Sequence, residues 1–559
     1  MRLRIIFYVA FVLLVGLSEE YAMPDEPCVT VWTQDALVKV LPDAKPDEGA
    51  SRVVRIDAVR NEYESGQVVV TGNREIEKLA FSLGKVDGAP GPKPRVEAHF
   101  VGYVPVKKGT PDPPAKAVAK APADLPDPLL DAAWVSVQAG KNQPIWITVF
   151  VPPDCRPGLY TTELRVCADG FSTVVPVEIN VHPVTLPNDR TLKITNWFNP
   201  GKFSRSADIG SWKKTHWKIA RSWARIMAAH RQNVVITPIM QLITGREDDA
   251  GNIEWDFSQF DRWIQLFKEE GVVGYIEGSH LGGRNEWEAP DFDAYLPNIY
   301  SQDGTLKPKP NIKVTSAEEQ QFLSRFLPAL QKHLEEKGWI DIYFQHLCDE
   351  PITANAESYK KLASYVRQYA PKLKIIDACQ CTEIAGSIDI WVPLTDHFER
   401  DLQFYKDRQR AGEEVWFYTC LAPRGDYMNR FIDYPLLDVR LIHWMNFRYN
   451  VSGYLHWGLN YWHGDAFKDL EPDWGGGNYL PPGDSHIVYP GRRGPLSSIR
   501  FEAMRDGIED YELLKLLEKV NPGLANEIAV SVVRTGTDYT LDPKQFRAAR
   551  HRLICALER

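Results

Sequence analysis

The chain has 559 residues, of which 65 are lysine or arginine and 74 are aspartate or glutamate, giving a formal net charge of −9. Because both signs of charge are mixed along the chain, neither nucleic acid nor an anionic membrane surface is expected as its main partner. A hydrophobic content of 44% with 17 tryptophans excludes a disordered or collagen-like chain, and the length predicts at least two domains.

The first residues have the layout of a secretory signal peptide. A basic stretch, MRLR, precedes the apolar run Ile5–Leu17, and the small residues Gly16 and Ser18 suit cleavage after Ser18. A membrane-spanning helix needs about 20 apolar residues, so an uncleaved membrane anchor is the alternative. We expect residues 1–22 to be a signal peptide and the mature protein to be secreted or periplasmic.

Eight cysteines in a chain of this length do not make a disulfide scaffold. Cys155 and Cys167 flank a predicted hairpin, where they could pair. The spacing in CQC (379–381) is not that of a zinc finger, and buried structural thiols explain the remaining cysteines better. We therefore expect no metal and no cofactor.

Residues 23–188 are predicted to form a β-sandwich. Apolar and polar residues alternate, with Gly and Pro between the runs, in SRVVRIDAVRNEYESGQVVVTG, QPIWITVFVPPDCRPGLYTTELRV and TVVPVEINVHPVTLP. Residues 109–128 carry six prolines in twenty residues and are expected to form a long irregular loop.

Residues 189–496 alternate strand-like and helical segments. The eight apolar runs are at 192–198, 233–239, 272–280, 339–350, 373–381, 388–394, 414–420 and 451–462. Eight strands with helices between them predict a (β/α)8 TIM-like barrel. An open doubly wound sheet is the alternative, disfavoured because no glycine-rich phosphate loop follows the first run. Residues 497–559 are predicted to be a C-terminal helical segment that packs on the barrel, with Arg505–Glu509 as an i,i+4 ion pair.

Two adjacent carboxylates, Asp349 and Glu350, end the apolar run IYFQHLCDEP. In a barrel of this kind the active site lies at the C-terminal ends of the strands, which makes the pair candidate catalytic residues. The alternative is structural: Asp349 as the cap of a following helix. Residues at the other strand ends, typical of a sugar-binding pocket, are Asn196, Trp197, His280, Tyr418, His456, Trp457, Asn460 and Trp462. Asp484 and Tyr489 lie on a long loop after the last strand that could close over the pocket, and they are further candidate sugar contacts.

The adjacency of the two carboxylates indicates a particular chemistry. Ordinary glycosidases place two carboxylates across the scissile bond, which neighbouring residues cannot do. Neighbours suit a substrate that supplies its own nucleophile, a 2-acetamido carbonyl that forms an oxazolinium intermediate. Asp349 would then orient the acetamido group, and Glu350 would be the acid/base, kept protonated by the nearby like charge.

CDEP, SGYLHWGLNYW and VYPGRRGPLSSIRFEAMRDGIEDYELL resemble the catalytic domain of glycoside hydrolase family 123, and RNEYESGQVVV and PGLYTTELRV resemble the β-sandwich that precedes it. The resemblance covers nearly the whole mature chain. It implies an exo-acting, retaining β-N-acetylgalactosaminidase or β-N-acetylhexosaminidase, with Asp349 and Glu350 as the catalytic pair. In such enzymes an aromatic hydroxyl or indole N–H holds the acetamido oxygen, for which Tyr418 and Trp457 are the candidates. The expected partner is a glycan or glycoconjugate with a terminal β-linked N-acetylhexosamine.

Two other functions stay open. Glu350 could pair with a carboxylate from another strand, such as Glu277 or Asp377, in a glycosidase for sugars without an acetamido group. Alternatively, the chain could be an inactive carbohydrate-binding protein on a glycosidase frame, against which the intact Asp-Glu pair counts.

Overall fold

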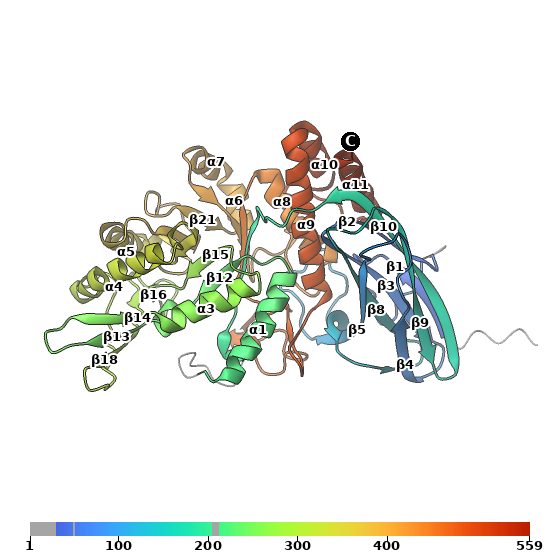
Figure 1. Cartoon of the computed structure of the whole chain (residues 1–559), viewed down its shortest axis with the longest axis horizontal. Helices are drawn as coiled ribbons and strands as arrows, with labels where there is room; N and C mark the ends of the chain where they lie inside the picture. The colour runs from blue at the N-terminus through green and yellow to red at the C-terminus, as the bar shows by residue number, and fades with distance from the viewer. Residues whose placement is uncertain (1–28, 48–50, 204–211, 559) are drawn as a thin grey trace, which may run out of the picture.

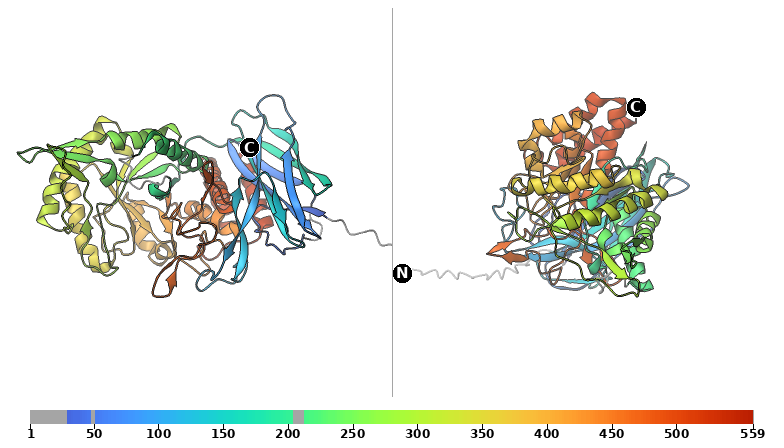
Figure 2. Two further views of the ribbon diagram at one scale, coloured as in Figure 1. Left: turned by 90° about the horizontal axis from the view of Figure 1, so that it is seen from below. Right: turned by 90° about the vertical axis from the view of Figure 1, so that its left-hand side faces the viewer.

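The computed structural model describes residues 29–47, 51–203 and 212–558, and the predicted signal peptide lies outside them. The chain forms a β-rich lobe and a mixed α/β lobe, with helix α9 (Ile499–Val520) between them (Figures 1 and 2). Within the described residues, no helix is both long and apolar enough to cross a membrane.

The β-rich lobe is a sandwich of two five-stranded sheets. The first sheet has the order β1 (Val29–Gln34), β3 (Glu62–Gly72), β8 (Asn142–Val151), β5 (Arg95–Val106) and β6 (Ala123–Leu130). The second has the order β2 (Val54–Arg60), β10 (Phe171–Thr185), β9 (Gly158–Ala168), β4 (Ile76–Leu83) and β7 (Val135–Val137). In β10, alternate residues from Val175 to Val181 are buried in the core between the sheets, as the sequence pattern predicts.

Two details of this lobe differ from the predictions. Strand β6 begins at Ala123, inside the segment expected to be a loop, and holds Pro126 opposite Tyr103. Because β6 is an edge strand, a residue without an N–H is tolerated there. Cys155 and Cys167 are both free: Cys155 is buried in the core, whereas Cys167 is exposed on the outer face of β9.

The α/β lobe contains parallel strands at all eight predicted positions. They are β11 (Lys193–Asn196), β12 (Val234–Thr237), β15 (Tyr275–Gly278), β19 (Tyr343–Gln345), β20 (Lys374–Cys379), β21 (Ile390–Pro393), β22 and β23 (Glu414–Val415 and Phe417–Thr419), and β24 (Gly453–His456). Within the described residues they hydrogen-bond as two sheets, β12-β15-β19-β20-β21-β22 and β11-β24-β23, and do not close into a single continuous barrel sheet. A backbone hydrogen bond from Asn233 to Ile194 and a parallel bridge between Leu394 and Tyr418 connect the two sheets.

Helices follow most of these strands. They are α1 (Lys214–Ala229), α2 (Ile239–Leu242), α3 (Ser258–Glu269), α4 (Ala317–Glu336), α5 (Ala356–Tyr369), α6 (Thr395–Arg400), α7 (Leu402–Arg410) and α8 (Leu436–Tyr449). Residues 380–389, between β20 and β21, contain no helix, which departs from a regular β/α repeat. The loops carry short strands: β13 (Thr244–Glu247), β14 (Ile253–Asp256), β16 (Gly282–Gly283), β17 (Asp293–Ala294), β18 (Asn298–Ser301), β25 (Asp473–Gly475), β26 (Asn478–Tyr479), β27 (Tyr489–Pro490) and β28 (Pro495–Leu496).

The parallel strands share one apolar cluster. Val234 of β12, Phe344 of β19, Ile376 of β20, Val392 of β21 and Leu455 of β24 belong to it, together with further residues of the same strands. Side chains of both sheets therefore meet in a common interior.

Helices α9, α10 (Pro522–Val532) and α11 (Pro543–Leu557) form the C-terminal segment, and α9 runs between the two lobes (Figure 1). The charged face of α9 is buried. Glu509 of α9 accepts a hydrogen bond from Arg231 of the α/β lobe (2.7 Å) and another from the backbone N–H of Tyr63 in the sandwich (2.9 Å). The predicted Arg505–Glu509 pair is wrong, because Arg505 bonds instead to Glu502 (2.6 Å). The tail therefore packs on both lobes, not on the barrel alone.

Candidate active site

The acidic pair is separated by three residues from the end of β19 at Gln345, and both side chains line a cavity of about 440 Å³. Neighbouring residues of an extended strand point to opposite faces, so two consecutive side chains reach one cavity only if the chain turns. Glu350 supplies the turn, with φ of +50°, a conformation that is uncommon for residues other than glycine. Its backbone is held by hydrogen bonds from its N–H to Ala378 (3.0 Å) and from Arg284 to its carbonyl (2.8 Å).

The carboxylate of Glu350 accepts two hydrogen bonds on the same oxygen, Oε1. They come from the hydroxyl of Tyr418 (2.5 Å) and the side-chain amide of Gln380 (2.9 Å). Burial raises the pKa of Glu350, the charge of Asp349 raises it further, and the two donors oppose the rise. Since both donors contact Oε1, the carboxyl proton belongs on Oε2.

Asp349 has a different environment. Its side chain is half exposed, at 50%, because it faces the open cavity. Protein surrounds it on the other sides, and burial followed by the charge of Asp377 raises its pKa to about 6. The two carboxyl groups are adjacent in the chain, but only Glu350 is bound by neutral hydrogen-bond donors.

A buried charged network lies beneath the acidic pair. His346 is bonded through Nδ1 to Asp377 (2.7 Å) and through Nε2 to Glu277 (2.6 Å). Burial alone would lower its pKa, but these two carboxylates raise the pKa of His346 to about 10, so it is an imidazolium at neutral pH. Glu277 also accepts hydrogen bonds from Trp197 (2.8 Å) and Thr195 (2.6 Å). The network fixes an aromatic wall of the cavity, and the imidazolium of His346 offsets one of the two carboxylate charges below it.

The walls of the cavity are mainly aromatic. In addition to the acidic pair, its lining includes Trp197, Tyr418, Trp457, Tyr461, His463, Asp473, Trp474 and Leu480. Trp474, in β25, is 56% exposed at the rim. The ring of Trp457 packs against that of Tyr461, with centroids 5.3 Å apart. Aromatic faces around paired carboxylates suit the binding of a sugar ring.

Of the predicted sugar-binding residues, Trp197, Tyr418 and Trp457 line this cavity. His280 lines a neighbouring cavity, with Nε2 3.9 Å from Asp349 and 3.7 Å from Asp377, and burial lowers its pKa to about 4. It is therefore a neutral ring next to the acidic pair.

Six other predicted contacts point elsewhere, and their side chains are bonded within the protein. Asn196 accepts a hydrogen bond from Arg430, Asn460 binds the backbone of Asn199, and Trp462 donates to Val488. The remaining three are His456, Asp484 and Tyr489.

The loop that holds Asp484 and Tyr489, a candidate cover for the pocket from the sequence, is buried core. Asp484 lies behind the cavity wall, where it accepts a hydrogen bond from the indole of Trp457 (3.2 Å) and faces His456 (3.4 Å). Burial raises its pKa to about 7. Tyr489 donates to Asp127 of the sandwich (2.6 Å).

Sequence reasoning missed four residues of the site: Gln380, His346, Tyr461 and Trp474. Gln380 and Tyr461 follow strands, so their positions gave a signal. Trp474 gave no such signal, because it lies on a glycine-rich hairpin (β25 and β26) far in sequence from the ends of the eight parallel strands.

Two family models match the chain: the glycoside hydrolase 123 catalytic domain over residues 197–517 and the glycoside hydrolase 123 N-terminal domain over residues 41–168. Among solved structures, a family 123 glycoside hydrolase from Clostridium perfringens, studied for glycolipid glycan hydrolysis, is 18% identical with a TM-score of 0.73. The match covers 95% of this chain and 98% of that one. A β-galactosidase from the psychrophilic Marinomonas ef1 is 10% identical over 61% of this chain and 62% of its own, with a TM-score of 0.34. A search of curated proteins found no match.

The two family-model matches define the chain as a glycosidase, an enzyme that acts on glycans or glycoconjugates. Because the catalytic-domain model covers more than half of its length, the chain belongs to glycoside hydrolase family 123. The resemblance drawn from its sequence motifs is thus confirmed.

Proposed function

We propose that the chain is an exo-acting, retaining β-N-acetylhexosaminidase with a preference for N-acetylgalactosamine, and that the acetamido group of the substrate is the nucleophile. The observation that carries the proposal is the turn at Glu350, which brings Asp349 and Glu350 into one cavity from adjacent positions. Two carboxylates on adjacent residues can fill the two roles of an acetamido-assisted displacement, but they cannot lie on opposite faces of a sugar ring.

In the proposed mechanism, Glu350 begins protonated on Oε2 and donates that proton to the leaving glycosidic oxygen. Asp349, ionised above its pKa of about 6, accepts the acetamido N–H and balances the positive charge of the oxazolinium. The ionised Glu350 then takes a proton from the water that opens the ring, which restores the starting state. Tyr418 and Gln380 stabilise the ionised form of Glu350 between the two steps.

The acetamido oxygen needs a hydrogen-bond donor, and the contacts favour a residue that the sequence did not single out. The hydroxyl of Tyr418 is bonded to Glu350, and the indole N–H of Trp457 is bonded to Asp484. Tyr461 lines the same cavity, and its pKa is raised to about 12 by burial and by the charge of Asp349, so its hydroxyl stays protonated beside that carboxylate. We assign the acetamido contact to Tyr461. Tyr418 and Trp457 could make this contact only if their hydrogen bonds to Glu350 and Asp484 broke.

The common apolar interior of the two parallel sheets supports a closed, TIM-like arrangement in which β19 opens at the catalytic rim. The N-terminal segment supports a secreted or periplasmic location, in which the substrate is an external glycan or glycoconjugate with a terminal β-linked N-acetylhexosamine.

The alternative nucleophiles from other strands are less suited to the task. Glu277 and Asp377 are fully buried and do not line the cavity. Each is bound to His346 and to two further donors, those on Asp377 being Tyr359 and the backbone N–H of Leu347. A carboxylate that is fully buried and already bound by three hydrogen-bond donors is poorly placed to attack a sugar.

The test compares hydrolysis of aryl β-GalNAc, β-GlcNAc and β-Gal by the wild type and by Glu350→Gln, with an oxazoline-mimicking thiazoline as inhibitor. We expect cleavage of β-GalNAc that the thiazoline blocks and that falls by about 10²–10⁴-fold in the variant. Cleavage of β-Gal without inhibition by the thiazoline would move the nucleophile to another residue and refute substrate assistance.

A further inference from the structure

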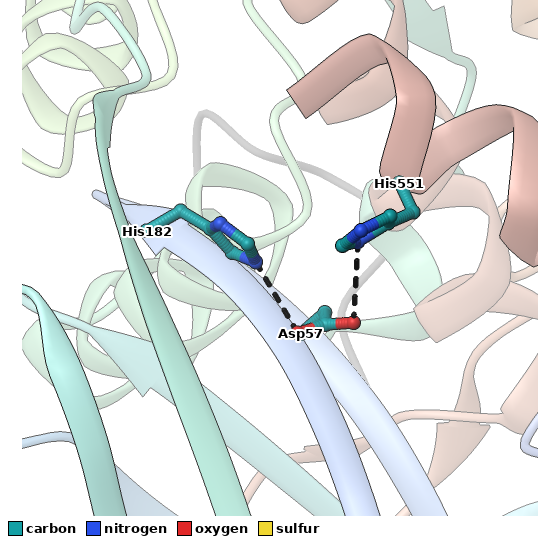
Figure 3. Close-up of side chains that lie close together, drawn as sticks. All are labelled: Asp57, His182 and His551. Atoms are coloured by element: carbon teal, nitrogen blue, oxygen red, sulfur yellow. Dashed lines mark hydrogen bonds and ion pairs between the residues drawn. The ribbon is translucent and has the colours of Figure 1, made fainter. Parts of the chain in front are cut away.

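A second cluster of ionisable side chains lies on the sandwich, away from the catalytic cavity. It joins Asp57 of β2, His182 of β10 and His551 of α11. Figure 3 shows Asp57 between the two imidazole rings, each with a ring nitrogen toward its carboxylate. Asp57 Oδ1 is 3.2 Å from His182 Nε2, and Asp57 Oδ2 is 3.7 Å from His551 Nδ1.

We propose that Asp57, His182 and His551 form a zinc-binding site that fastens the C-terminal helix α11 to the outer face of the sandwich.

The backbone register explains why these groups meet. Strands β2 and β10 are parallel, and Asp57 is directly opposite Asn180. Because side chains alternate along a strand, Asn180 and His182 are on the same outer face as Asp57. Helix α11 covers that face and contributes His551 from its last two turns. Three ligands from three separate elements thus converge without any change of fold.

The donor geometry fits a tetrahedral ion. Zinc bonds of about 2.0–2.2 Å to imidazole nitrogen and carboxylate oxygen place neighbouring ligand atoms about 3.3 Å apart. The separations from Asp57 are close to this value but belong to its two different oxygens, Oδ1 for His182 and Oδ2 for His551. With one ligand atom taken from each residue, the three atoms all lie within 4.8 Å of one another. Two nitrogens and one carboxylate oxygen form a donor set that suits zinc better than calcium or magnesium, which prefer oxygen.

The surroundings of His182 are those of a metal ligand. Its second ring nitrogen, Nδ1, is bonded to Glu558 (2.7 Å), the carboxylate–histidine arrangement that orients ligating imidazoles. On the other side, the amide nitrogen of Asn180 contacts both His182 Nε2 (3.0 Å) and Asp57 Oδ1 (2.8 Å). A hydrogen-bond donor therefore occupies the direction from which a cation would bind. If the side-chain amide of Asn180 rotated, either its oxygen would face the zinc or the fourth coordination position would be left to water.

The site is also reachable from solvent. The side chains of Asp57 and His551 are 46% and 56% exposed, whereas His182 is only 8% exposed. Hydrogen bonds from the ring of His182 to the carboxylates of Asp57 and Glu558 raise its pKa, so zinc competes with a proton there and binding is measured at mildly alkaline pH.

The experiment measures zinc content and thermal midpoint of the full chain after removal of metal and dialysis against micromolar zinc. We expect about one zinc per chain in the wild type, and loss of that zinc in both Asp57→Asn and His551→Ala. Glu558→Gln should bind zinc about 10–100-fold more weakly, because it removes only the group that orients His182. The matched control is His99→Ala, which removes a sandwich histidine outside the cluster and should bind like the wild type.

Zinc should raise the thermal midpoint of the wild type and of His99→Ala and leave that of His551→Ala unchanged. Hydrolysis of an aryl glycoside should not depend on the metal, since the site is on the other lobe, so its outcome is separate from that of the proposed function. Failure of the wild type to bind zinc would overturn the proposal. Retention of the zinc by either Asp57→Asn or His551→Ala would overturn it as well.

Discussion

The hydrogen bond from Tyr418 to Glu350 gives a direct test of which carboxyl group is the general acid. We consider Tyr418→Phe, which removes the hydroxyl and keeps the ring that lines the cavity. The donor stabilises the ionised form of Glu350 and therefore lowers its pKa; without it the pKa rises. Since a general acid works only while protonated, the basic limb of kcat/KM should move to higher pH.

The size of the shift follows from the two donors on Oε1. A hydrogen bond to a charged group contributes about 1.5–3 kcal/mol, and one pKa unit corresponds to about 1.4 kcal/mol. Gln380 remains bonded to the same oxygen in the variant and takes over part of the solvation. We therefore expect the lower end of the range, a shift of about one pH unit.

The assay is a pH profile of kcat/KM on an aryl β-N-acetylhexosaminide whose leaving group needs protonation. Tyr461→Phe is the control, because it removes a hydroxyl from the same cavity without touching Glu350. It should lower kcat/KM through the acetamido contact and leave the basic limb in place. An unmoved or downward-shifted basic limb in Tyr418→Phe would refute the assignment of Glu350 as the acid.

Three further predictions concern stability and substrate range. Glu319 in α4 has both carboxylate oxygens buried without a partner, and burial raises its pKa to about 8. The folded state thus binds an extra proton between about pH 4.5 and 8, so the stability of the protein falls as pH rises through that window. Glu319→Gln should therefore raise the thermal midpoint at pH 8 and have little effect near pH 4. Arg440, 1% exposed, bonds Glu64 and Asp510 between the lobes; Arg440→Ala should cost about 3–5 kcal/mol in denaturant unfolding, because it leaves buried carboxylates unpaired. Trp474→Ala should raise KM for an oligosaccharide about 3–10-fold and leave an aryl glycoside unaffected, because the exposed ring lies where a second sugar would stack.

The strands of both lobes could be predicted from the sequence because their signals are local. Period-2 alternation in β10 and the eight apolar runs of the α/β lobe each depend on a few neighbouring residues. The missing helix between β20 and β21 was less visible, since residues 380–389 show neither a strong helical stripe nor a clear break. The acidic pair was found because two carboxylates after an apolar run are costly unless they are used.

The partners of the polar residues could not be predicted in the same way. Asp484 and Trp457 are 27 residues apart, and Tyr489 and Asp127 are in different lobes. A position at a strand end predicts that a side chain lies near the rim. Tertiary packing decides whether that side chain faces the cavity or the protein interior. Asn196 illustrates the difference: it ends β11, yet its side chain is fully buried against Arg430.

The turn at Glu350 connects the sequence signal with the proposed chemistry. A residue with a side chain adopts φ of +50° only where its surroundings hold it there, and Pro351 adds a restriction on the residue before it. Hydrogen bonds to Ala378 and from Arg284 supply the hold, and Gln380 bonds both the side chain of Glu350 and the backbone of Pro351. A helix cap at Asp349 would need none of these contacts. The strain therefore argues that the chain is shaped to present two neighbouring carboxylates to one substrate, which is the requirement of a nucleophile carried by the sugar.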